Sequence, residues 1–131
     1  MKRLEMVQVL LHKAAQDEAV LETLVADPKF DDETVGFHAQ QAVEKLLKAW
    51  LSYLGVDYPK VHRLEMLLDL LQANGKTLPD DLANVTRLTP FATVFRYDDL
   101  PLAADIDRKG LLPLVRKVRA FVEKQIGDVT P

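Results

Sequence analysis

The chain has 131 residues, no cysteine and a formal net charge of −3. This length suits one domain that buries roughly two-thirds of its extended-chain surface, so a core can form without disulfides or metals. The lack of cysteine excludes disulfide scaffolds, thiolate zinc sites and cysteine nucleophiles, and it is compatible with a reducing, cytoplasmic location. No apolar run approaches the roughly 20 residues of a membrane span, and polar residues interrupt any signal-peptide pattern at the start.

Helical periodicity begins near the start of the chain. Apolar residues recur at helical spacing from Leu4 to Val25, and no helix breaker appears before Pro28. Asp27 precedes that proline and therefore avoids the helical region. We expect a first helix over residues 1–25.

The second predicted helix, over residues 37–54, organises the rest of the chain. Asp31, Asp32 and Glu33 supply a cap and negative charge for its start, and Gly55 suits its end. An apolar arc on this helix is wider than the stripe of an ordinary surface helix, so several other helices should pack on it. The arc consists of Ala39, Ala42, Val43, Leu46, Leu47, Ala49, Trp50, Leu51, Tyr53 and Leu54.

Three further periodic segments follow. The third helix covers about residues 61–73 and ends at Gly75, the fourth is short and begins near Pro79, and the last covers about residues 106–126. Their apolar faces are formed by Leu64, Leu67, Leu68 and Leu71, by Leu82, Val85, Leu88 and Phe91, and by Leu111, Val115, Val118 and Val122. No alternating strand pattern appears. We expect one all-α domain over residues 1–131, an up-and-down bundle of about five helices.

The polar side of the second predicted helix carries a candidate site. His38, Gln41, Lys45 and Lys48 follow steps of three, four and three, which place them in one stripe. Lysines are more often solvated, but two of them beside a histidine could face a phosphate. His38 could equally be satisfied by a neighbouring helix. The stripe is therefore a candidate nucleotide-binding surface without a specific motif.

The long predicted loop before the last helix contains Arg96 and Tyr97. An arginine can bind a phosphate through two parallel hydrogen bonds, and a tyrosine can stack on a base. The same two residues could instead pin the loop to the core, with Arg96 paired to a carboxylate. Both interpretations remain open, because loops on a rigid bundle often carry binding residues.

The remaining charged positions favour structural roles. His62 opens the third predicted helix, where local capping or packing is the favoured interpretation. A solvated face is the usual explanation for the basic residues of the last helix, which are Arg108, Lys109, Arg116, Lys117, Arg119 and Lys124. The chain has no Gly-rich phosphate loop and no His-Glu-x-x-His motif. Glu44 is the one acid in the interior of the second helix, so we expect no di-metal site and no cofactor.

One sequence block resembles a known family. The block Phe37-His38-Ala39-Gln40-Gln41-Ala42-Val43-Glu44-Lys45-Leu46-Leu47-Lys48-Ala49, then His62-x-Leu64 and Arg96-Tyr97, closely resembles the HEPN (higher eukaryotes and prokaryotes nucleotide-binding) domain family. The resemblance covers nearly the whole chain. It implies a five-helix bundle that usually dimerises, with the loop of Arg96 and Tyr97 brought to the polar stripe. It also implies a prokaryotic setting, where such proteins often accompany a minimal nucleotidyltransferase, commonly as toxin–antitoxin modules.

The ribonuclease signature of this family is missing. Many HEPN proteins are metal-independent ribonucleases whose signature is an arginine followed by four to six residues and a histidine, with two chains building the site. Arg3 is the one arginine that precedes any histidine, and eight residues separate it from His12. The chain therefore looks more like the branch that binds nucleotides or presents substrate to a nucleotidyltransferase.

Three functional hypotheses follow. The leading one is a non-catalytic, nucleotide-binding or substrate-presenting partner of a minimal nucleotidyltransferase. Its expected nucleotide or RNA contacts are His38, Gln41, Lys45, Lys48, Arg96 and Tyr97. One alternative is a metal-independent ribonuclease toxin that uses His38 and Arg96, and another is a purely structural dimeric partner protein. Apolar residues in excess of what five helices can bury, including Phe91, Phe95, Leu100 and Leu102, also predict a homodimer.

Overall fold

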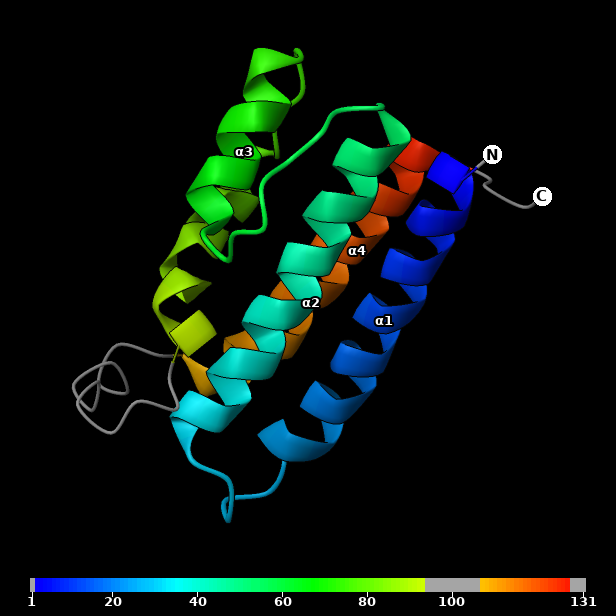
Figure 1. Cartoon of the computed structure of the whole chain (residues 1–131). Coiled ribbons are helices and arrows are strands. Elements are labelled where there is room, and N and C mark those ends of the chain that lie inside the picture. Colours follow the sequence, from blue (N-terminus) through cyan, green and yellow to red (C-terminus); the bar gives the residue numbers. More distant parts are fainter. Residues whose placement is uncertain (1, 94–106, 128–131) are drawn as a thin grey trace.

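The computed structural model describes residues 2–93 and 107–127, and that part of the chain forms five helices and no strand. The helices are α1 (Lys2–Val25), α2 (Asp32–Tyr53), α3 (Leu64–Ala73), the 3₁₀ helix η1 (Asp80–Thr93) and α4 (Arg108–Ile126). Figure 1 shows α1 antiparallel to α2, with α4 behind this pair and α3 and η1 forming a layer on the other side of α2. The predicted all-α class and the predicted number of helices are confirmed.

Helix α2 is the centre of the bundle and contacts every other helix. Asp31 caps its start, because the Asp31 carboxylate accepts a hydrogen bond of 2.9 Å from the Thr34 backbone N–H. The predicted apolar arc is buried from Ala39 to Leu51, and only its last two members are partly exposed. Trp50 lies edge-on to Phe121 of α4, with 5.6 Å between the ring centroids.

The connection from α2 to α3 runs back along α2 before α3 begins (Figure 1). This return places His62 beside the middle of α2, where the Gln40 side-chain amide donates to the His62 carbonyl at 3.0 Å. Helix α3 consequently begins at Leu64, three residues after the predicted start at Val61. Arg63 occupies its N-cap position without a side-chain hydrogen bond. Of the two structural roles expected for His62, capping or local packing, capping is therefore wrong.

The predicted fourth helix is present and is a 3₁₀ helix of 14 residues. Its buried residues are Leu82, Val85, Leu88 and Phe91, which recur every third position. A 3₁₀ helix has three residues per turn, so this spacing keeps all four side chains on one face. Phe91 packs on α2 over Gly36, where a Cβ atom, if present, would lie 2.7 Å from the phenyl ring.

Arg108, the first residue of α4, ties the end of α1 to the start of α2. Its guanidinium donates to backbone carbonyls and to one carboxylate. The acceptors are the carbonyls of Leu24, Val25, Asp27 and Phe30, at 2.9, 3.2, 2.7 and 2.6 Å, and the carboxylate of Asp32 at 3.1 Å. The basic residue nearest the start of α4 therefore satisfies helix-end carbonyls that have no partner within α1. None of the helices in the described part of the chain is long and apolar enough to cross a membrane.

Candidate functional site

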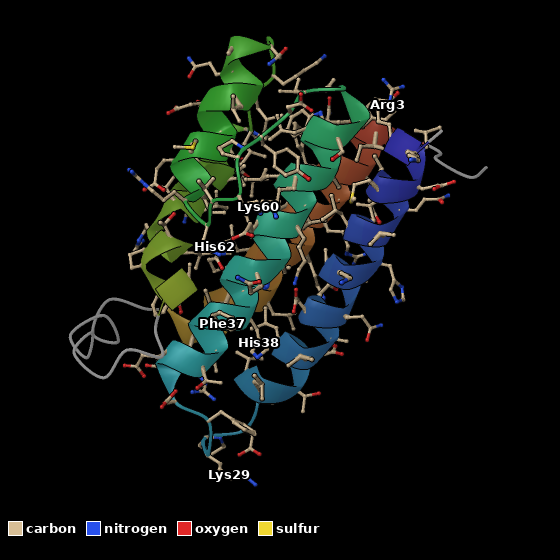
Figure 2. All side chains as sticks on the ribbon, viewed as in Figure 1. Arg3, Lys29, Phe37, His38, Lys60 and His62 are labelled. Atoms are coloured by element: carbon tan, nitrogen blue, oxygen red, sulfur yellow. The ribbon has the colours of Figure 1, made fainter. Side chains whose placement is uncertain are left out.

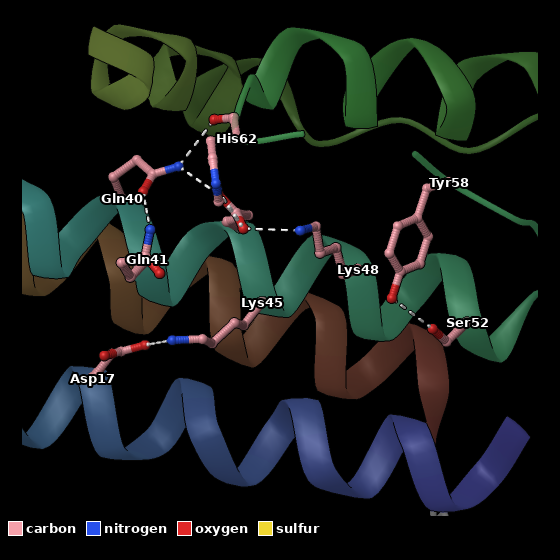
Figure 3. A network of polar contacts seen from close by, with 9 residues as sticks. Asp17, Gln40, Gln41, Lys45, Lys48, Ser52, Tyr58 and His62 are labelled. Carbon is pink, nitrogen blue, oxygen red and sulfur yellow. Dashed lines mark hydrogen bonds and ion pairs between the residues drawn. The ribbon is translucent and has the colours of Figure 1, made fainter. Parts of the chain in front are cut away.

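The polar stripe predicted on α2 is present, but its members make contacts on two sides of the helix (Figure 3). His38 and Lys45 approach α1. The Lys45 ammonium forms an ion pair with Asp17, and His38 Nδ1 lies 3.8 Å from the Asp17 carboxylate, beyond hydrogen-bond distance. We call Asp17, His38 and Lys45 the Asp17 cluster. His38 Nδ1 is buried and has no hydrogen-bond partner within the described residues.

Gln41 and Lys48 contact the opposite side of the stripe, toward the connection that precedes α3. The Gln41 amide donates to Gln40 Oε1 at 2.7 Å, and Lys48 Nζ donates to Glu44 Oε2 at 2.9 Å. Lys48 also lies over the ring of Tyr58, 5.6 Å from its centroid. Both lysines of the stripe are thus paired with a carboxylate, and their side chains are only 23 % and 14 % exposed.

The Glu44 carboxylate is the central acceptor of a hydrogen-bond network that the sequence pattern does not predict. We call Gln40, Gln41, Glu44, Lys48 and His62 the Glu44 network. Gln40 and Glu44 are the buried polar residues of the described part of the chain, and Glu44 is 4 % exposed. Its carboxylate accepts hydrogen bonds from Gln40 at 2.8 Å, from Lys48 at 2.9 Å and from His62 Nδ1 at 3.0 Å. A buried carboxylate needs such donors, because an unpaired charge in the interior is very costly.

The hydrogen bonds to Glu44 keep it ionised. Burial by itself would raise the pKa of Glu44, but the hydrogen bonds from Lys48, Gln40 and His62 outweigh burial and leave the pKa below its ordinary value. An ionised carboxylate accepts hydrogen bonds and cannot donate them. The proton between Glu44 and His62 therefore lies on His62 Nδ1, and His62 Nε2 carries the free lone pair when the ring is neutral. The His62 side chain is 61 % exposed.

A sequence signal for this network exists. Gln40 and Glu44 are four residues apart, and both neighbour the apolar arc of α2 rather than the centre of its polar stripe. Two polar side chains at that border need buried partners. The sequence does not show that His62 supplies one of them, because the approach depends on the connection folding back along α2.

Two arginines of α4 form ion pairs with α1. Arg116 contacts Glu18 at 3.4 Å and Glu22 at 2.6 Å, and Arg119 contacts Glu18 at 2.7 Å. These ion pairs join α4 to α1 on a different surface from the polar stripe. Two of the six basic residues of the last helix, Arg116 and Arg119, are thus paired with acids of α1.

Arg96 and Tyr97 lie outside the described residues, so their position relative to the stripe stays a prediction. No predicted site residue borders the cavity of about 130 Å³ between η1 and α4. Its lining is half apolar and half polar or glycine: Leu88, Phe91, Leu111 and Leu114, with Asn84, Arg87, Asp107 and Gly110. Within residues 2–93 and 107–127, no three His, Asp or Glu side chains are grouped closely enough to hold a metal ion.

Comparison with known proteins identifies the family. The family model for the HEPN domain matches residues 7–125, which is nearly the whole chain and includes both the Asp17 cluster and the Glu44 network. No curated protein and no solved structure matches the chain with significance. The sequence resemblance and the all-α bundle agree with the family match. The chain belongs to the HEPN domain family.

Proposed function

We propose that this HEPN protein binds a nucleotide or an RNA end on the polar face of α2 and presents it to a minimal nucleotidyltransferase, without cleaving it. Family membership supports a general role connected with nucleotides or RNA. The finer assignment is supported by one observation. The partly exposed polar side chains of α2 are held in place by two carboxylates, Asp17 and Glu44, in a helix that is otherwise buried.

This arrangement favours weak binding. Lys45 and Lys48 each face a carboxylate, so the local charge is close to balanced and a phosphate must compete for each ammonium. Such contacts are sensitive to salt, because phosphate binding by lysine and arginine releases counterions. Presentation to a second protein is compatible with weak binding, since that partner would supply further contacts.

Asp17→Asn tests whether Lys45 contacts the ligand. This change removes the charge that holds Lys45, so affinity for a short single-stranded RNA should rise at least about two- to fivefold. That is the range expected for an exposed ion pair, and this pair is partly buried. The matched control is Glu18→Gln, which removes the same charge from the next residue of α1, where Arg116 and Arg119 are the partners. Equal effects of the two variants in a fluorescence titration would mean that affinity depends only on net charge. Lys45 would then not be a contact of the ligand.

Incubation of the metal-free protein with unstructured, end-labelled RNA tests the absence of turnover. We expect retarded but intact RNA, with retardation that weakens as salt rises. The proposed partner is tested in two steps: a search of the neighbouring reading frames for a minimal nucleotidyltransferase, and co-expression of that protein with this chain. Co-purification of the two proteins is expected, and their separation at low salt would count against a presenting role.

One observation favours ribonuclease activity as a second candidate function. RNA cleavage requires a group that accepts the 2′-hydroxyl proton, and a histidine oriented by a carboxylate is suited to this task. His62 beside Glu44 meets that description, whereas the sequence pattern points only to His38. RNA cleavage that accompanies the purified protein and disappears in His62→Asn or His38→Ala would establish this alternative and refute the proposal of binding without turnover.

A further inference from the structure

Helix α2 holds His62 at two points. The Gln40 amide donates to the His62 carbonyl at 3.0 Å, and Glu44 accepts from the imidazole Nδ1 at 3.0 Å and, through its other oxygen, at 3.3 Å. Gln40 is itself bonded to Glu44 at 2.8 Å. Backbone and side chain of His62 are thus both fixed by adjacent members of one network (Figure 3).

A purely structural contact would not need this carboxylate. The bond from Gln40 to the His62 carbonyl already fastens the connection to α2. A buried ionised carboxylate loses its hydration, and well-packed apolar groups are often at least as stabilising as a buried ion pair. The imidazole that Glu44 orients is nevertheless more than half exposed, so the buried charge directs a side chain whose far edge faces solvent.

The orientation leaves a specific chemical group at the surface. Because Nδ1 donates to Glu44, the neutral ring presents Nε2 as a hydrogen-bond acceptor. Figure 2 shows His62 on the face where α2 lies between α1 and α3, which is also the face that carries His38. Lys48 binds the same carboxylate as His62. One buried carboxylate therefore places an acceptor and a cation side by side.

This pair of groups fits one part of a nucleotide in particular. A fully ionised phosphate offers acceptors and no donor, so it suits Lys48 and not Nε2 of the neutral imidazole. A ribose hydroxyl is a donor that every ribonucleotide carries within reach of a phosphate. We infer that His62 Nε2 accepts a hydrogen bond from a ribose hydroxyl of the bound nucleotide, with Glu44 as the positioning residue. This inference rests on the proposed nucleotide-binding function and names the recognised group.

The ring tautomer tests the role of Glu44. In ¹⁵N NMR spectra, neutral His62 should be in the Nδ1–H form, which is the minor form of free histidine. Glu44→Gln should shift the population toward the Nε2–H form. An Nε2–H form in the unaltered protein would overturn the inference, because Nε2 would then be a donor.

Binding of nucleotides tests the role of Nε2. The four ribonucleoside 5′-monophosphates are titrated against their 2′,3′-dideoxy counterparts. The unaltered protein should bind at least one ribonucleotide about three- to tenfold more tightly than its dideoxy form, as expected for one hydrogen bond. His62→Asn keeps a donor close to the position of Nδ1 but has no equivalent of Nε2, so it should bind both forms equally. His12→Asn, the same change at an exposed histidine of α1, should retain the preference.

The outcomes separate the inference from the proposed function. Equal binding of ribonucleotide and dideoxynucleotide by the unaltered protein would overturn the inference and leave nucleotide binding intact. A preference that persists in His62→Asn would assign the hydroxyl contact to another residue and also overturn it. Binding of neither form would refute the proposed function and the inference together. If His62→Asn fails to fold, the tautomer of His62 and the comparison of the two ligands on the unaltered protein still test the inference, because an Nε2–H form or equal binding would each overturn it.

Discussion

At the scale of single residues, Glu44 shows how an interior charge is made compatible with folding. Its three donors come from two residues of its own helix, Gln40 and Lys48, and from His62, which is eighteen positions away. The donors on α2 follow from helical spacing of four residues. The third donor depends on tertiary structure, so the sequence alone recovers only part of the environment of Glu44.

The lowered pKa of Glu44 predicts a specific acid sensitivity. A carboxylate whose pKa is lower in the folded state stabilises the protein above its unfolded pKa, roughly 4.3, and this contribution disappears as the pH falls through the folded pKa. Glu44→Gln should lower the free energy of unfolding at pH 7 by about 1–3 kcal/mol, because Lys48 and His62 lose their charged acceptor. As the pH falls from roughly 5 through the folded pKa of Glu44, the free energy of unfolding should decrease less steeply for Glu44→Gln than for the unaltered protein.

Urea unfolding at several pH values measures both effects. Glu5→Gln, at an exposed position of α1, is the control for loss of one carboxylate. Parallel stability curves for the unaltered protein and Glu44→Gln through the acid range would show that Glu44 is not held ionised by its network.

At the scale of elements, the contact between α2 and η1 depends on a missing side chain. A Cβ atom on Gly36 would lie 2.7 Å from the Phe91 ring, which is closer than atoms can pack. Gly36→Ala should therefore cost about 1–3 kcal/mol through overpacking, offset by up to about 1 kcal/mol of improved helix propensity. The double variant Gly36→Ala with Phe91→Leu should lose less free energy of unfolding than the sum of the losses in the two single variants. Additive losses in thermal unfolding would show that the two residues do not interact.

The junction of α1, α2 and α4 depends on the shape of one guanidinium. Arg108 donates to four carbonyls and to Asp32, and a lysine ammonium cannot reproduce that planar set of donors. Arg108→Lys should lower the free energy of unfolding by about 2–4 kcal/mol, since buried carbonyls lose charged donors. Arg116→Lys, at an exposed ion pair of the same helix, should produce no measurable change. Similar denaturant midpoints for both variants would contradict the role assigned to Arg108.

At the scale of the whole molecule, much of the fold can be predicted from the sequence. The start of α2 follows from Asp31, its buried arc from helical periodicity, and the end of α1 from Pro28. Some predicted features differ from the structure. Helix α2 begins at Asp32, five residues before the predicted range of 37–54. The predicted start of α3 is three residues too early, and His62 does not cap that helix, because the contact of His62 with α2 is not local. The predicted fourth helix is present as a 3₁₀ helix, which its strict spacing of three residues favours.

The candidate site is less predictable than the fold. Spacing places His38, Gln41, Lys45 and Lys48 on one face, but it does not show which acids face them. Asp17 lies on a different helix from the two residues that it contacts, and the sequence pattern identifies Glu44 only as a lone acid. The predicted contribution of Arg96 and Tyr97 concerns residues outside the described part of the chain.

The homodimer remains a prediction, and part of its rationale changes with the structure. Phe91 is buried within the chain and contributes nothing to an exposed patch, whereas Phe95, Leu100 and Leu102 lie outside the described residues. Within the described residues, the large exposed apolar side chains are Met6, Val9 and Val20 of α1 and Met66 of α3. Val9 and Val20 are separated by about three helical turns. Multi-angle light scattering should give twice the chain mass of 14.8 kDa. Val9→Lys should reduce that mass if α1 forms the interface, and a monomer at micromolar concentration would refute the prediction.

The most direct test of nucleotide binding on the polar face of α2 is a ¹H–¹⁵N NMR titration of the protein with a short single-stranded RNA. The largest amide shifts are expected at Gln41, Lys45, Lys48 and His62, and the RNA should be intact when the titration ends. Shifts confined to the outer surface of α4 around Arg116 would place the binding surface elsewhere. Absence of shifts at millimolar RNA, or cleavage of the RNA during the titration, would contradict binding without turnover.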